Sequence, residues 1–104
     1  MNLNRAYIYI LSNKNRTVFY IGITNDLERR VSENKSRTSE GFTKKYNVFD
    51  LVYYEIHNEI TQAIRREKQL KEWKRSWKID LIKEMNSEMV DLAHDWEHNQ
   101  MTHV

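Results

Sequence analysis

Two short apolar segments near the start of the chain place the strongest constraint on its fold. Ala6–Asn13 and Val18–Thr24 both alternate in hydrophobicity with a period of two, which is the pattern of half-buried strands. The polar letters NKNRT lie between them, so we expect a β-hairpin. Counted by two, one face of each strand carries these residues: Tyr7, Tyr9 and Leu11 in the first, and Val18, Tyr20, Gly22 and Thr24 in the second.

The remaining segments predict a small α+β domain. Asn25 is the expected N-cap of a helix from Asp26 to about Lys35, since Glu28 stands at the capping-box position. After a predicted loop, SRTSEGFTKKYN, we expect a strand at 50–57, a helix from 58–61 to 73, a helix at 76–85 and a short helical piece that begins at Ser87. The order β-β-α-β-α-α indicates a three-stranded antiparallel or mixed sheet flanked by helices. Residues 1–86 would form its body, and 87–104 an acidic helical tail of the same domain.

Composition excludes several classes of protein. A chain of 104 residues has room for one domain with one modest core. There is no cysteine, so disulfides and thiolate metal sites are excluded, and no apolar run approaches the length that spans a bilayer. Because the region around Arg5 lacks a signal-peptide pattern, we expect a cytoplasmic protein without a membrane partner.

Charge is divided unevenly along the chain. The net charge is +2, yet 16 Lys or Arg and 9 Asp or Glu precede Ile79, whereas 1 Lys or Arg and 6 Asp or Glu lie from Ile79 onward. The stretch RREKQLKEWKRSWK (65–78) holds seven basic residues. Such clustering favours a polyanionic partner such as nucleic acid, and a solvated helix face with i,i+4 ion pairs is the alternative. Trp73 and Trp77, four residues apart in this stretch, either pack in the core or stack on bases.

Tyr9 and Tyr20 stand where valine or isoleucine would pack more simply. A tyrosine on a half-buried sheet face is usually a packing residue whose hydroxyl finds a convenient partner. Gly22, however, weakens its strand and is typical of a close approach by another group. We therefore consider the two tyrosines as the floor of a site, with open space beside Gly22. One phenol there could act as a general base if its pKa were lowered.

Two charged residues fall on or beside apolar helix stripes. Arg30 adjoins the stripe of the helix expected at 26–35, where it either covers the edge of the core or binds a phosphate with its planar fork. Glu67 falls in the middle of the stripe of the next helix. Because burying an unpaired carboxylate is costly, Glu67 requires a partner. That partner is either Arg30 or a divalent ion such as Mg²⁺, which proteins often hold with one or two carboxylates plus substrate phosphates.

The order and spacing of these residues resemble the GIY-YIG nuclease superfamily. Tyr7-Ile8-Tyr9 is followed after ten residues by Tyr20-Ile21-Gly22, and Arg30 comes eight residues after the glycine. The stretches GITNDLERRV, GFTKKYNVFDLVYYE and AIRREKQLKEWKRSWKIDLI look like the small stand-alone group that is similar to the N-terminal domain of UvrC. The resemblance covers 6–86, with Glu67 and Asn86 in the family's order.

This resemblance implies an endonuclease that hydrolyses phosphodiester bonds of DNA, in repair or recombination, with one divalent ion, Mg²⁺ or Mn²⁺. By the same resemblance, Tyr9 or Tyr20 would deprotonate or orient the attacking water. Arg30 would bind and stabilise the scissile phosphate, and Glu67 would hold the metal. Charge stabilisation of this kind is what phosphodiester hydrolysis requires.

Two positions depart from the family pattern. Tyr7 stands at the first glycine of the motif, a change common among small members. Asn34, one turn after Arg30 at a catalytic position, stands where this group usually has histidine. Because an asparagine side chain cannot take up a proton, any acid–base role at this position is lost.

Further candidates have weaker support. The residues expected to contact the substrate are Gly22, Lys44, Lys45 and Asn86. The asparagine matches one near the family's site, and the lysines either contact the nucleic-acid backbone or are only surface charges. His94 and His98 form a two-histidine metal face if the tail is helical, or belong to a solvated acidic tail.

Two alternatives to the nuclease are left open. One is a catalytically weak or inactive nucleic-acid-binding module, which is suggested by Asn34 in place of the usual histidine. The other is a subunit that depends on another protein for targeting, because no base-reading element is evident in the sequence.

Overall fold

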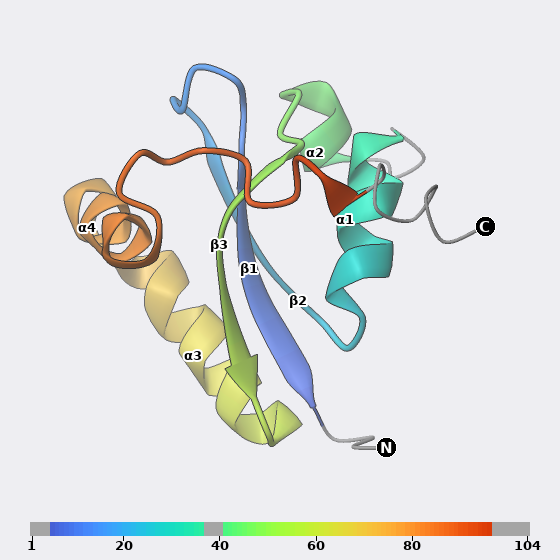
Figure 1. Cartoon of the computed structure of the whole chain (residues 1–104). Coiled ribbons are helices and arrows are strands. Elements are labelled where there is room, and N and C mark those ends of the chain that lie inside the picture. The colour runs from blue at the N-terminus through green and yellow to red at the C-terminus, as the bar shows by residue number, and fades with distance from the viewer. Residues whose placement is uncertain (1–4, 37–40, 97–104) are drawn as a thin grey trace.

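The computed structural model of the chain describes residues 5–36 and 41–96. Within these ranges the elements, shown in Figure 1, are β1 (Ala6–Ser12), β2 (Phe19–Thr24), α1 (Leu27–Lys35), α2 (Phe42–Lys45), β3 (Asp50–His57), α3 (Ile60–Glu72) and α4 (Arg75–Met85). The central strand, β1, pairs antiparallel with both neighbours, in the order β2-β1-β3. The predicted α+β class and element order are confirmed, and the sheet is antiparallel.

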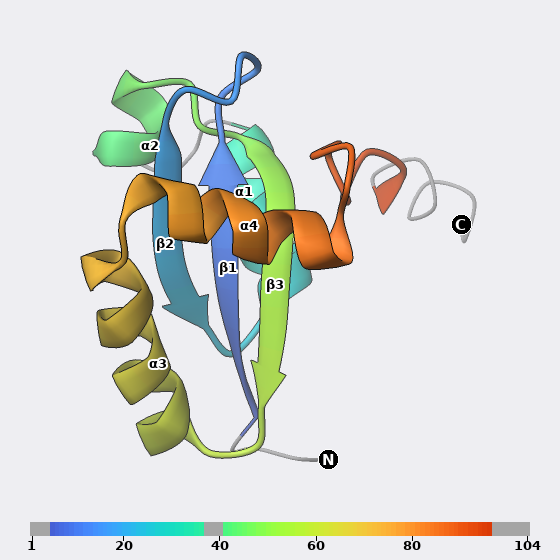
Figure 2. The ribbon, with the colours of Figure 1, turned by 90° about the vertical axis from the view of Figure 1, so that its left-hand side faces the viewer.

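Helices cover both faces of this sheet. The helix α1 lies on one side, and α3 and α4 lie on the other (Figure 1). Figure 2 shows α4 crossing the strands, while α3 runs beside β2, an edge strand of the sheet. The outer edge of β2 therefore lies between α1 and α3.

The period-two pattern divides the buried residues into two clusters. On the side of α3 and α4 the cluster includes Ala6, Ile8, Ile10, Ile21, Val52, Leu70 and Ile82. On the side of α1 it includes Tyr9, Leu11, Leu27, Val31, Val48 and Leu51, with Tyr7, Val18 and Tyr20 packed against it. The predicted division of β1 and β2 into two faces is thus confirmed.

The start of α1 and the following loop differ from the prediction. Asp26, rather than Asn25, is the N-cap: its carboxylate accepts a hydrogen bond from the Arg29 amide at 3.2 Å. The Asp26 amide in turn donates to Thr24 Oγ1 at 3.1 Å, which holds 24–26 in a turn before the helix begins. The predicted loop contains α2, a single turn of helix.

The C-terminal segment also differs. Residues 87–95 are turns and irregular backbone, so the prediction of a helix that begins at Ser87 is wrong. The cause is that this segment forms hydrogen bonds to β3, with only short turns within itself. The Leu92 amide donates to the Leu51 carbonyl at 2.7 Å, and Asp91 Oδ1 accepts from the Leu51 amide at 2.9 Å. Residues 97–104, which include His98 and the rest of the predicted tail, lie outside the described residues.

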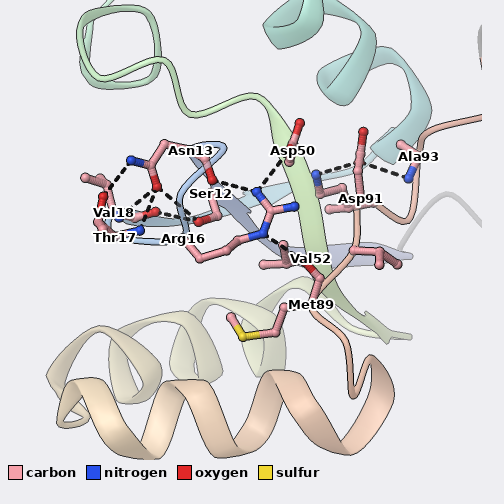
Figure 3. Close-up of polar contacts among 12 residues, drawn as sticks. Ser12, Asn13, Arg16, Thr17, Val18, Asp50, Val52, Met89, Asp91 and Ala93 are labelled. Atoms are coloured by element: carbon pink, nitrogen blue, oxygen red, sulfur yellow. Dashed lines mark hydrogen bonds and ion pairs between the residues drawn. The ribbon is translucent and has the colours of Figure 1, made fainter.

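Arg16 fastens this segment to the sheet (Figure 3). Its guanidinium donates to the Asn13 carbonyl at 2.5 Å, to Asp50 Oδ2 at 2.8 Å and to the Met89 carbonyl at 2.8 Å. The loop between β1 and β2, the start of β3 and the segment after α4 are therefore joined by one side chain. Residues 86–96 belong to the body of the domain.

Candidate active site

Tyr9 and Tyr20 lie on the face of the sheet that α1 covers. Tyr9 is opposite Gly22 in the β1–β2 register and Tyr20 is opposite Leu11, so the two tyrosines are diagonal neighbours. Their ring centroids are 6.3 Å apart and the ring planes are tilted by 43°. Tyr9 is 3% exposed and Tyr20 is half-buried. The hairpin therefore brings both phenols together, one beneath the surface and one nearer to it.

Gly22 makes room for the ring of Tyr9. A Cβ atom at position 22 would lie 2.3 Å from Tyr9 Oη and 2.4 Å from Tyr9 Cζ. These are distances that side chains do not adopt, so only glycine admits the phenol across its backbone. The space beside Gly22, expected to be open for a substrate, is filled by Tyr9.

Arg30, from the middle of α1, carries an unused hydrogen-bond donor. Its Nε is buried and has no hydrogen-bond partner among the described residues, while the side chain as a whole is 41% exposed. Over the residues that the structure describes, its ion-pair contact is with Glu33 Oε1, at 4.0 Å from that Nε, which is too long for a hydrogen bond. An unsatisfied buried donor on a cation is a ready contact for an anion.

Glu67 is supplied by α3, which runs beside β2. Its side chain is 17% exposed, and its Oε2 lies 3.5 Å from Lys71 Nζ. Within 5–36 and 41–96 no ion pair joins Glu67 to Arg30, so the predicted salt bridge between them is not formed. The neighbouring Arg66 is also not its partner, because that guanidinium binds Glu55 at 2.9 Å. Glu67 therefore keeps a partly buried carboxylate with one flexible lysine beside it.

The Tyr9 hydroxyl is within the electrostatic reach of the other three groups. Burial raises the pKa of Tyr9 to about 12, with further upward contributions from Tyr20 and Glu67 and a downward one from Arg30. Tyr9 is therefore a protonated hydrogen-bond donor near neutral pH. The condition set for a tyrosine general base, a lowered pKa, is not met at Tyr9.

Other predicted site residues have different surroundings. Asn34 is 2% exposed, and its Nδ2 donates to the Arg30 carbonyl one turn earlier at 2.8 Å. Lys44 and Lys45 are exposed on α2, with Lys45 Nζ 5.4 Å from the centroid of the Tyr46 ring. His94 is exposed, at 4.0 Å from Asp95.

Asn86 has a structural role. Its Nδ2 donates to the carbonyls of Val52 at 3.0 Å and Val90 at 2.7 Å, and its Oδ1 accepts from the Val90 amide at 3.1 Å. The side chain is buried and caps the end of α4 against β3. Its amide is thus fully engaged with the backbone, which corrects the expectation that it contacts the substrate.

Sequence reasoning missed Glu33. This residue lies three positions after Arg30, on the same side of α1, and its carboxylate contributes to raising the pKa of Tyr9. The i,i+3 spacing from an arginine was the signal available in the sequence.

The donor set at Glu67 fits a hard cation that retains water. Among the described residues there is no group of three or more His, Cys, Asp or Glu side chains that could hold a metal ion. A single carboxylate suits Mg²⁺, which dehydrates reluctantly and takes much of its coordination from water and substrate phosphates. An all-protein cage is not the kind of site that these residues form.

A hollow of about 310 Å³ opens on the same side of the sheet, near the start of α1. Its lining includes Tyr7, Leu27, Tyr54 and Trp96. Tyr9, Tyr20, Arg30 and Glu67 do not line it. The four groups therefore lie outside this hollow.

The candidate site combines two phenols from the hairpin, a guanidinium from the following helix and a carboxylate from the helix beside the sheet edge. This arrangement is the one expected for a GIY-YIG domain. The family model described as the GIY-YIG catalytic domain matches residues 5–80, and the chain belongs to this family.

Individual relatives lie in the UPF0213 group. A UPF0213 protein of Staphylococcus saprophyticus is 30% identical over 82 residues, covering 79% of this chain and 99% of the relative. A UPF0213 protein of Syntrophus aciditrophicus is 31% identical, covering 79% of this chain and 94% of the relative. The solution NMR structure of a UPF0213 protein from Bacillus halodurans is 29% identical, with a TM-score of 0.49, and covers 76% of this chain and 83% of that one. Over the residues that the structure describes, none of the helices has the length and apolar character needed to cross a membrane.

Proposed function

We propose that this protein is a divalent-metal-dependent endonuclease that hydrolyses phosphodiester bonds of DNA. The observation that carries the proposal is the buried Nε of Arg30, which has no hydrogen-bond partner among the described residues, in electrostatic reach of Tyr9, which is also reached by Tyr20 and by the partly buried carboxylate of Glu67. Membership of the GIY-YIG family supports a nuclease and a nucleic-acid partner. The choice of DNA, and a setting in repair or recombination, follow from the resemblance described above.

Each side chain has a distinct task in this mechanism. Arg30 binds a non-bridging oxygen of the scissile phosphate and stabilises the negative charge that grows there in the transition state. Tyr9, which stays protonated, donates a hydrogen bond to the phosphate or to the attacking water. Tyr20 is less buried and is the phenol that orients or deprotonates the water. Glu67 would hold Mg²⁺ or Mn²⁺, and a bound ion would supply further charge neutralisation at the phosphate.

The chain offers closely matched controls for a test. Arg30→Ala and Glu67→Gln should each lower the rate of Mg²⁺-dependent nicking by about a hundredfold or more, as expected for removal of one charge-stabilising group. Arg29→Ala and Glu72→Gln remove the same charges from exposed positions on the same two helices and should leave the rate unchanged. Branched, single-stranded and duplex DNA should be compared. Equal nicking by all four variants and the wild type would eliminate the proposed mechanism.

A non-catalytic nucleic-acid-binding module is a second candidate, favoured by Asn34. This buried amide donates to the backbone of its own helix and offers no proton acceptor of suitable basicity. Salt-dependent binding of DNA without nicking above the background of the Arg30→Ala and Glu67→Gln variants would favour this candidate.

A further inference from the structure

The junction between α3 and α4 carries a group of cations that the mechanism above does not use. We define the basic elbow as Lys71, Lys74, Arg75 and Lys78. Residues 71–78 contain these four basic residues and one acidic residue, Glu72. The first three cations are exposed and Lys78 is half-buried. Figure 2 shows the chain turning here, beside β2.

Specific contacts hold the elbow in place. The Arg75 guanidinium lies 4.9 Å from the centroid of the Phe19 ring and donates to the Arg16 carbonyl at 3.1 Å. These contacts fasten the elbow to the first residue of β2 and to the loop before it. Lys78 Nζ lies 3.5 Å from the Lys71 carbonyl, which brings the end of α3 and the start of α4 together. The backbone of the elbow is therefore held beside β2 through Arg75.

The two tryptophans of this region have different environments. Trp73 is half-buried, packs against the core and lies under the Arg66 guanidinium, 5.2 Å from its Cζ. Trp77 is 50% exposed, and its ring meets that of Trp73 edge-on, with 6.1 Å between centroids. Lys74 Nζ lies 5.4 Å from the Trp77 centroid. Thus the exposed ring of Trp77 is held in place by Trp73 and has the Lys74 cation beside it.

The elbow adjoins the candidate active site. Lys71 Nζ, its first cation, is 3.5 Å from Glu67 Oε2. A nucleic-acid strand whose phosphate lies at Arg30 and Glu67 would meet Lys71 next and then the other cations of the elbow.

We infer that the basic elbow binds the backbone of a single nucleic-acid strand next to the cleaved phosphate, and that an unpaired base stacks on Trp77. This inference rests on the proposed function for the position of the cleaved phosphate. Cations that follow a backbone together with an exposed aromatic ring are the combination that binds single strands. In a duplex the base faces are covered by their neighbours, so an exposed tryptophan favours the single strand.

The test measures binding without chemistry. Fluorescence anisotropy of a labelled single-stranded oligonucleotide and of the matching duplex is recorded in EDTA between 50 and 200 mM salt. Lys74→Gln/Lys78→Gln should reduce the slope of log affinity against log salt for the single strand by about 1.4, at 0.7 for each phosphate that the variant no longer neutralises. Arg5→Gln/Lys83→Gln makes the same change in net charge away from the elbow and should leave the slope unchanged.

Trp77→Ala tests the stacked base. It should weaken binding of the single strand by about fivefold or more and have little effect on the duplex. The inference is overturned if the elbow variants bind the single strand as the wild type does, if the control pair has the same effect, or if the duplex loses as much affinity as the single strand. Nicking in Mg²⁺ is measured separately: a wild type that binds through the elbow without nicking contradicts the proposed function and leaves the elbow supported.

Discussion

Replacing Gly22 with alanine tests how the hairpin positions Tyr9. The added Cβ would lie 2.3 Å from Tyr9 Oη, so the buried ring must move. Overpacking of this kind costs about 1–3 kcal/mol. Gly22 does not have a positive φ, so alanine also gains about 0.4–1 kcal/mol by restricting the unfolded chain. The difference of these two effects is about 0–2.6 kcal/mol, and we expect Gly22→Ala to lower the free energy of unfolding by an amount within this range.

A double-mutant cycle measured by urea unfolding isolates the contact between the two residues. In a Tyr9→Leu background the phenol is absent, and Gly22→Ala should be neutral or should stabilise the protein by about 0.4–1 kcal/mol. The coupling free energy between the two sites should then equal the overpacking cost, about 1–3 kcal/mol. An equal cost of Gly22→Ala in both backgrounds would refute the view that this glycine exists to admit the Tyr9 ring.

Two further predictions concern stability. Asn86→Ala leaves the Val52 and Val90 carbonyls without their side-chain donor and should lower the free energy of unfolding by about 1–3 kcal/mol, whereas the exposed neighbour Ser87→Ala should have little effect in the same urea experiment. Tyr9 has a pKa raised from 10.0 to about 12 in the folded protein, so its neutral form is favoured by folding. Its contribution to stability is complete below pH 10 and is lost as the pH rises from 10 to about 12. The wild type should lose more stability over this interval than Tyr9→Phe, and equal losses would contradict the raised pKa.

The sequence predicts the fold through patterns that depend on neighbouring residues. The period-two alternation assigns the hydrophobic side chains of β1 and β2 to the correct faces, and Asp50–His57 is predicted with its observed bounds. The N-cap of α1 is displaced by one residue because Thr24 and Asp26 form a turn that local capping rules do not distinguish. The segment after α4 is mispredicted because Asp91 and Leu92 form hydrogen bonds with Leu51, about 40 residues earlier.

The sequence predicts which residues form the site better than it predicts their surroundings and protonation. Spacing in the sequence suggests Tyr9, Tyr20, Arg30 and Glu67, and the structure brings the last three within electrostatic reach of Tyr9. The sequence does not reveal that Tyr9 fills the space beside Gly22 or that burial raises the pKa of Tyr9. Both depend on how the Tyr9 ring crosses the neighbouring strand. The role of Asn86 follows from contacts with β3 that no local pattern encodes.

The central claim is that Arg30 and Glu67 act on one phosphate with the tyrosine pair. Its most direct test is a crystal structure of the wild type with Mn²⁺ and a non-hydrolysable oligonucleotide, in which the metal is located by its anomalous signal. We predict one ion bound by the Glu67 carboxylate and a phosphate of the oligonucleotide bound by the Arg30 guanidinium. An ion bound elsewhere, or a phosphate at Arg30 with Glu67 still paired to Lys71 and no metal, would contradict the proposed mechanism.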